Sequence, residues 1–109
     1  MNDEILLVVK SVIPSDRAQE FNEYYHRNHI PDMIKMSGCT NAKRFKAIET
    51  DDQYLYMATY EFSRNAFNNY QNGEARKWLV QDFASHYGGI AKTGKSTWEK
   101  IYPPVSAKK

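Results

Sequence analysis

Residues 53–62 restrict the fold of this chain most, because they predict a strand with apolar side chains on both of its faces. Alternate side chains of a strand point to the same face of the sheet. One face would carry Tyr54, Tyr56, Ala58, Tyr60 and Phe62, and the other would carry Leu55, Met57, Thr59 and Glu61. A sheet with one face in water shows a polar residue at every second position instead. We therefore expect a sheet that is covered on both faces.

The segment before this strand predicts a helix over residues 16–29. One stripe at helical spacing is formed by Ala18, Phe21, Tyr25 and His29, and such a stripe is typical of a helix that packs on a core. Pro31 has no backbone N–H and disfavours helical backbone at the residue before it. The helix is therefore expected to end or kink at Ile30.

The rest of the pattern alternates between strands and helices. Strands are predicted at residues 4–13, 40–49 and 96–102, and the polar residues 50–52 form a turn between the two middle strands. A second helical region is predicted to begin at Ser63, to be interrupted at Gly73 and to stop at Gly88. The order strand, helix, strand, strand, helix, strand is that of the ferredoxin-like split βαβ unit.

The predicted fold class is therefore α+β, a ferredoxin-like βαββαβ domain with a four-stranded antiparallel sheet and its helices on one face. The 109 residues suffice for one domain, which we assign to residues 1–102, with residues 103–109 as an extended or disordered tail. The other sheet face would be apolar and bare, and such a face implies a partner. The simplest partner is a second copy about a two-fold axis, so we expect a homodimer through the open sheet face that forms a dimeric α/β barrel.

Composition excludes several classes of protein. The 15 Lys and Arg residues against 13 Asp and Glu are spread along the chain, which argues against a nucleic-acid binder with a concentrated basic face. No apolar run is long enough to span a membrane, and the N-terminus has no basic leader, so we expect a cytoplasmic protein without membrane contact. The single cysteine excludes an internal disulfide and a multi-cysteine metal site. Eight tyrosines indicate partly solvent-exposed surfaces such as a pocket or an interface.

Several motifs resemble those of one known family. The segment from Phe21 to Pro31 resembles the aromatic…His-x-Pro signature of EthD-like dimeric α/β-barrel proteins, and residues 36–38 stand where that family has a Pro-Gly turn. Residues 42–45 resemble its Ala-Arg-Arg-Tyr strand, and residues 54–62 resemble its Tyr-Leu-x-x-Tyr-Glu strand. The motifs keep their order over about residues 5–102, although Ser37 and Phe45 replace the usual Pro and Tyr.

This resemblance implies a homodimer in which each subunit has a cleft between its sheet and its helices. Relatives in the wider superfamily include cofactor-independent monooxygenases, polyketide cyclases, muconolactone-type isomerases and haem-degrading enzymes. The implied function is that of a small enzyme that moves a proton on a carbonyl-bearing or aromatic small molecule without a cofactor. The alternative is a non-catalytic binding or carrier protein for an aromatic metabolite or haem, and a purely structural dimerisation module is a third interpretation.

His29 is the predicted catalytic residue. It shares the helix stripe that faces the sheet, and an imidazole can take and return a proton near neutral pH. The alternative role is a buried histidine that caps the helix end before Pro31. His26, three residues earlier, could form a metal-binding pair with His29, but it lies toward the polar side and no third ligand is evident, so no metal site is expected.

Six further residues are candidates for substrate binding. They are Tyr25, Arg44, Tyr56, Tyr60, Trp78 and His86. If Arg44 points inward it would anchor a carboxylate or enolate, and if it points outward it is an ordinary surface residue or a dimer salt bridge. The tyrosines and Trp78 are pocket walls or core, and His86 is a residue of the cleft mouth or of a helix surface.

Residues 89–96 match the pattern G-x-x-x-x-G-K-S of phosphate-binding P-loops. That loop requires a strand before it and a helix after it. Here a helix precedes the segment and a strand follows it. We therefore interpret the match as chance and the segment as a basic connection near the mouth of the cleft.

Overall fold

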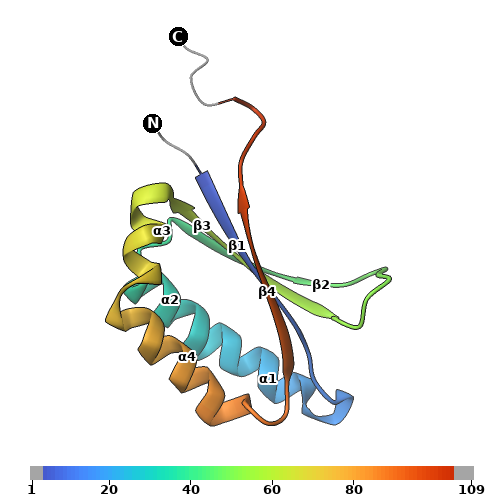
Figure 1. The fold of residues 1–109 in the computed structure, drawn as a ribbon. Coiled ribbons are helices and arrows are strands. Elements are labelled where there is room, and N and C mark those ends of the chain that lie inside the picture. The colour runs from blue at the N-terminus through green and yellow to red at the C-terminus, as the bar shows by residue number, and fades with distance from the viewer. Residues whose placement is uncertain (1–3, 105–109) are drawn as a thin grey trace.

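The computed structural model describes residues 4–104 of the chain as one α/β unit with two layers (Figure 1). The strands are β1 (Glu4–Val12), β2 (Asn41–Lys46), β3 (Tyr56–Ser63) and β4 (Lys92–Glu99). The helices are α1 (Ala18–Tyr24), α2 (Ile30–Met36), α3 (Arg64–Gln71) and α4 (Glu74–Tyr87). A 3-10 turn at Ser15–Arg17 precedes α1, and a π-helical turn at Tyr25–His29 joins α1 to α2. Residues 105–109 of the predicted tail lie outside the described residues.

The four strands form one antiparallel sheet in the order β2-β3-β1-β4. Leu7 of β1 is opposite Tyr60 of β3 on one side and Thr97 of β4 on the other. All helices lie on the same face of the sheet (Figure 1). The predicted α+β ferredoxin-like fold is therefore confirmed.

The helix before the second strand does not end at Ile30, which was the first of the two outcomes expected from Pro31; its hydrogen-bond ladder changes directly before that residue instead. The Ile30 N–H donates to the carbonyl of Tyr25, five residues back, in the wider ladder of a π-helical turn. Pro31 is the second residue of α2 and directly follows the π-helical turn, so its missing N–H interrupts the ladder where that ladder has already widened. Helical backbone thus continues from α1 to Met36.

The π-helical turn also keeps four side chains, spaced four residues apart, on the side of the helix that faces the sheet. In a regular α-helix each four-residue step drifts about 40° around the axis. The wider turn removes part of that drift, and Phe21, Tyr25 and Met33 are all at most 2% exposed. His29 occupies the remaining position of this stripe, so the turn directs it toward the sheet.

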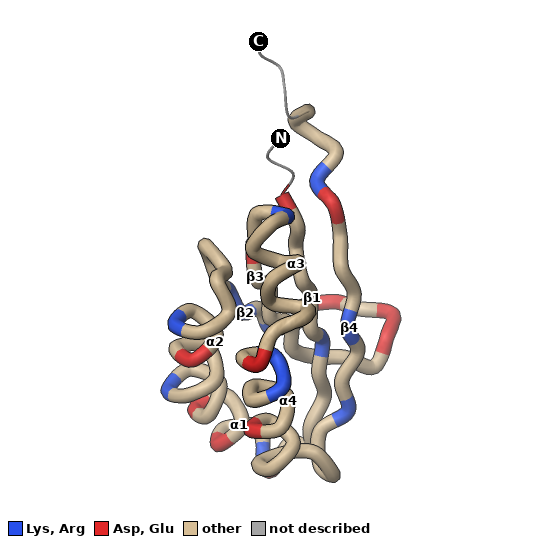
Figure 2. The backbone as a smooth tube through the Cα atoms, turned by 60° about the vertical axis from the view of Figure 1, so that its left-hand side comes forward, with Lys and Arg blue, Asp and Glu red and all other residues tan. Residues whose placement is uncertain are grey.

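The last strand begins at Lys92, four residues before the predicted start. β4 is an edge strand, and most of its residues on both faces are polar. Its composition therefore does not identify it as a strand. Lys95 is paired with Val9, whose side chain faces the helices, whereas Lys92 is paired with Val12 and has the opposite orientation. Lysine and arginine occur along β4 and on neighbouring α4 (Figure 2).

The second face of the sheet carries no helix among the described residues. Apolar side chains on it come from all four strands, namely Leu6, Val8, Phe45, Met57 and Trp98. Trp98 is 60% exposed and Phe45 is 46% exposed. The pairing of two such sheets into a dimeric barrel stays a prediction. Within residues 4–104, no helix combines the length and apolar character needed to cross a membrane.

Candidate active site

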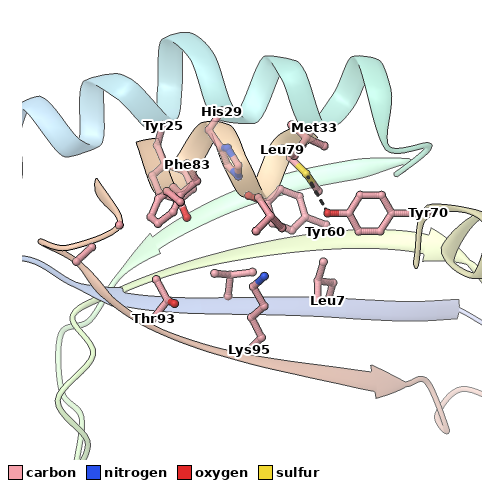
Figure 3. Close-up of a pocket in the computed structure, with 15 residues that line it drawn as sticks. Leu7, Tyr25, His29, Met33, Tyr60, Tyr70, Leu79, Phe83, Thr93 and Lys95 are labelled. Atoms are coloured by element: carbon pink, nitrogen blue, oxygen red, sulfur yellow. Dashed lines mark hydrogen bonds between the residues drawn. The ribbon is translucent and has the colours of Figure 1, made fainter. Parts of the chain in front are cut away.

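A cavity of about 260 Å³ lies between the helices and the sheet (Figure 3). Its roof is formed by the π-helical turn and α4, and its floor by β1 and β4. Apolar residues make most of its wall, including Leu7, Val9, Met33, Leu79, Val80 and Phe83. The polar lining residues are Tyr25, His29, Tyr60, Tyr70, Thr93 and Lys95. A concave, mostly apolar site with a few converging polar groups is typical of a small-molecule pocket.

His29 enters the cavity from the helix side (Figure 3). Its Nδ1 is buried and has no hydrogen-bond partner among the described residues. The pKa of His29 is lowered to about 4, mainly by burial; Asp82 opposes this shift, and the positive charges of Lys95 and Arg44 add to it. The imidazole is therefore neutral at pH 7 and offers an acceptor nitrogen in an apolar space.

Tyr60 enters the cavity from β3, opposite the helix that carries His29 (Figure 3). Its hydroxyl is buried without a hydrogen-bond partner among the described residues. Burial raises the pKa of Tyr60 well above its usual value. The hydroxyl therefore stays protonated and can donate a hydrogen bond. Tyr25 is similar, because burial raises its pKa to about 12 although Arg44 opposes this.

Lys95 and Thr93 enter from β4 on the floor of the cavity (Figure 3). Lys95 is exposed at the sheet edge, and its Nζ points toward the cavity (Figure 3). Burial lowers the pKa of Lys95, and the charge of Arg76 lowers it further. The sequence interpretation missed both residues, and only the alternation along 93, 95 and 97 could have indicated that they share the helix side.

Arg44 points inward, which decides between the two orientations considered for it. Its guanidinium lies 4.1 Å from the centroid of the Tyr25 ring and donates from Nη1 to Asn22 Oδ1 at 2.8 Å. It does not line the cavity but lies behind Tyr25 and faces a second, open groove beside His26. Arg44 therefore supports Tyr25 by a cation–π contact and adds positive charge near the site.

Three other predicted substrate-binding residues lie outside the cavity lining. Tyr56 packs near Phe21, with ring centroids 6.2 Å apart. Trp78 is 47% exposed on α4. His86 is exposed, stacks near Tyr24 with ring centroids 4.6 Å apart, and has its Nδ1 2.8 Å from the carbonyl oxygen of Asp82. The structure thus brings His29, Tyr25 and Tyr60 together and leaves Tyr56, Trp78 and His86 around them.

The P-loop-like segment has the wrong local structure for phosphate binding. Helix α4 precedes it, and most of it belongs to strand β4, so no helix N-terminus follows its glycines. Within residues 4–104 no cluster of three or more His, Cys, Asp or Glu side chains could hold a metal ion.

Comparison with solved structures shows the same fold in several small proteins. An EthD family protein from Bacillus halodurans aligns with a TM-score of 0.67 and 16% identity, over 93% of this chain and 100% of its own. A DABB family protein with a ferredoxin-like fold from Mesorhizobium loti aligns with a TM-score of 0.63 and 16% identity, over 91% and 98%. SnoaB, a cofactor-independent oxygenase from Streptomyces nogalater, aligns with a TM-score of 0.61 and 13% identity, over 93% and 98%.

These neighbours confirm, at the level of the fold, the resemblance to EthD-like proteins that the motifs predicted. No curated protein matches the sequence significantly. The family described as "Domain of unknown function (DUF4286)" matches residues 4–101, and the chain therefore belongs to the DUF4286 family.

Proposed function

We propose that this chain is a small enzyme that moves a proton on a carbonyl-bearing or phenolic molecule held in the cavity. The observation that carries this proposal is the pair of buried polar atoms, His29 Nδ1 and Tyr60 Oη, that have no partner among the described residues and belong to side chains lining one apolar cavity. Leaving such an atom unpaired costs about 1–3 kcal/mol. A bound substrate with a polar group would recover that free energy.

The two groups have complementary roles in such a reaction. Neutral His29 accepts a proton from a carbon next to a carbonyl, or from a phenol, and Tyr60 donates a hydrogen bond to the oxygen on which negative charge develops. Burial is the main cause of the low His29 pKa, and the positive charges of Lys95 and Arg44 that add to it also stabilise an enolate or phenolate. Once that anion is present, it offsets them and favours the protonated imidazole.

The same anion can react in three ways. Reprotonation at another carbon is an isomerisation, attack on a second carbonyl is a cyclisation, and reaction with dioxygen is an oxygenation. The description of SnoaB as a cofactor-independent oxygenase supports chemistry of this kind on this fold, and we propose proton abstraction as the shared first step.

Hydrogen–deuterium exchange in D₂O tests this proposal without knowledge of the natural product. A panel of 1,3-diketones and hydroxyaryl ketones is incubated with the protein, and loss of the acidic carbon-bound proton is followed by NMR. His29→Gln should slow exchange by about 10²–10⁴-fold, whereas His26→Gln, three residues away and exposed, should not. Exchange that is equal in wild type and His29→Gln contradicts the proposal. Binding without exchange favours the carrier interpretation instead.

We also propose that the open sheet face pairs with a second copy of the chain. Large exposed apolar side chains on one face, including Trp98 and Phe45, are typical of an interaction surface. A two-fold arrangement would cover both faces with the same residues. Sedimentation equilibrium should give a dimer, and Trp98→Lys should shift it toward monomer; a monomeric wild type at micromolar concentration contradicts the proposal.

A further inference from the structure

The charges of the cavity lining have one sign. Among the described residues that line the cavity there is no aspartate and no glutamate, and Lys95 carries the formal charge. Two arginines lie just outside it. Arg44 stacks on Tyr25, and Arg76 is close enough to Lys95 to lower its pKa. Asp82 lies close enough to His29 to raise its pKa, so the positive charge is concentrated on the β4 side of the cavity, at Lys95.

Lys95 has no hydrogen bond or ion pair with another described residue. Two other lysines are paired: Lys10 of β1 pairs with Asp52 at 3.1 Å, and Lys100, just after β4, pairs with Glu4 at 2.6 Å. Lys95 is exposed at the sheet edge, but its ammonium loses part of its solvation beside the largely apolar cavity, and no described partner compensates that loss. An anion in the cavity would provide that compensation.

We propose that the ligand of this cavity is an anionic aromatic molecule whose carboxylate or phenolate oxygen binds Lys95 Nζ while its ring lies against the apolar wall near Phe83. This inference rests on the proposed function, because it takes the cavity as the substrate site. The cavity volume of about 260 Å³ is near the lower limit of about 300 Å³ for small-molecule sites. One or two fused rings therefore match it better than a larger ligand.

Lys95 and His29 enter from opposite walls of the cavity (Figure 3). An anionic group on Lys95 therefore orients the ligand, because it leaves the opposite part of the molecule toward His29 and Tyr60. The bound anion also cancels charge that disfavours protonation of His29, since Lys95 lowers the pKa of that imidazole. Binding an anion would thus turn His29 into a stronger base in the complex than in the free protein.

Matched pairs of ligands test the inference. We would measure by calorimetry the affinity of the wild-type protein for benzoate and benzamide and for 2-naphthoate and 2-naphthamide, which differ in charge but little in shape. At pH 7 at least one carboxylate should bind about 10- to 100-fold more tightly than its amide. Binding should also move the NMR titration midpoint of His29 to higher pH.

Variants on β4 assign the effect to one side chain. Lys95→Met should remove the preference for the carboxylate, and Lys95→Arg should retain part of it. Lys92→Met removes a lysine from the other face of the same strand and should leave both affinities within about twofold. Equal binding of acid and amide, or a preference that survives in Lys95→Met, overturns the anion site but leaves the cavity as a binding site. Failure of all four compounds to bind or to perturb His29 overturns the site itself and the proposed function with it.

Discussion

The space between helices and sheet is filled at one end and open at the other. Near α3, the rings of Phe62, Phe67 and Tyr70 pack with centroids 5.3–6.5 Å apart and leave little room. Toward β4, the cavity remains, with Tyr70 at the boundary. Both ends are rich in aromatic residues, so the open end does not reflect a lack of bulky side chains.

The two ends also differ in whether their buried polar atoms have hydrogen-bond partners. At the filled end the Tyr70 hydroxyl has a partner, the Met33 sulfur at 3.8 Å. At the open end Tyr60 Oη and His29 Nδ1 have none among the described residues. A packing defect would be lined by apolar groups, because such a void stays dry at little polar cost. The unpaired polar atoms around this space can instead be satisfied by a polar molecule, water or a ligand, that occupies it.

The largest expected effect is on stability at the filled end. Phe62 is 1% exposed and touches two other rings, so Phe62→Ala should lower the free energy of unfolding by about 3–5 kcal/mol. Phe83 is half-buried and one side of it faces the cavity, so Phe83→Ala removes less buried apolar area and should cost about 1–3 kcal/mol. Urea unfolding at pH 7 measures both. Equal losses would mean that the two ends are packed alike.

The second expected effect is a loss of folding stability as the pH falls into the acid range. His29 has a pKa of about 4 in the folded chain and about 6.5 when unfolded, so the unfolded state binds the proton first as the pH falls. The stability contributed by neutral His29 is complete above about pH 6.5 and is lost as the pH falls to about 4, by up to about 3 kcal/mol.

Comparison of two histidine variants isolates this contribution from that of the carboxylates. The difference in unfolding free energy between pH 7 and pH 4.5 should be smaller in His29→Gln than in wild type. His26→Gln, which changes an exposed histidine of the same helix, should keep the wild-type difference. An unchanged pH dependence in His29→Gln would place His29 in water and remove the contrast between the two ends.

The sequence predicted the fold well because its strongest signals are local and periodic. The apolar stripe through Phe21 and Tyr25 and the doubly apolar strand from Tyr56 to Phe62 fix one helix face and one central strand. The π-helical turn escaped prediction because Pro31 alone does not show how the hydrogen-bond ladder adapts around it. The start of β4 at Lys92 escaped because an edge strand needs no continuous apolar run.

The candidate site was predicted in part, for the same physical reason. His29, Tyr25 and Tyr60 lie on periodic stripes that already face the core, so their direction followed from spacing. Trp78 was expected in the pocket wall or the core, but it is 47% exposed, and the inward position on α4 belongs to its neighbour Leu79, about 100° away around the helix. For Lys95 the alternation along residues 93, 95 and 97 was the one available signal, and it is the register with Val9 that shows which face these residues share.

The smallest expected effect is a difference in sign between the stability changes that follow the removal of two tyrosine hydroxyls. The Tyr24 hydroxyl donates to Asp82 Oδ2 at 2.9 Å, and Tyr24→Phe should cost about 1–2 kcal/mol because that acceptor loses its donor. The Tyr60 hydroxyl has no partner among the described residues, so Tyr60→Phe should be neutral or stabilising by up to about 1 kcal/mol. The same Tyr60→Phe variant should slow hydrogen exchange on the ketone panel, since it removes the donor to the developing oxyanion. A variant that gains stability while losing activity would show that Tyr60 Oη is kept for a ligand, whereas a loss of stability like that of Tyr24→Phe would show that the fold itself uses this hydroxyl.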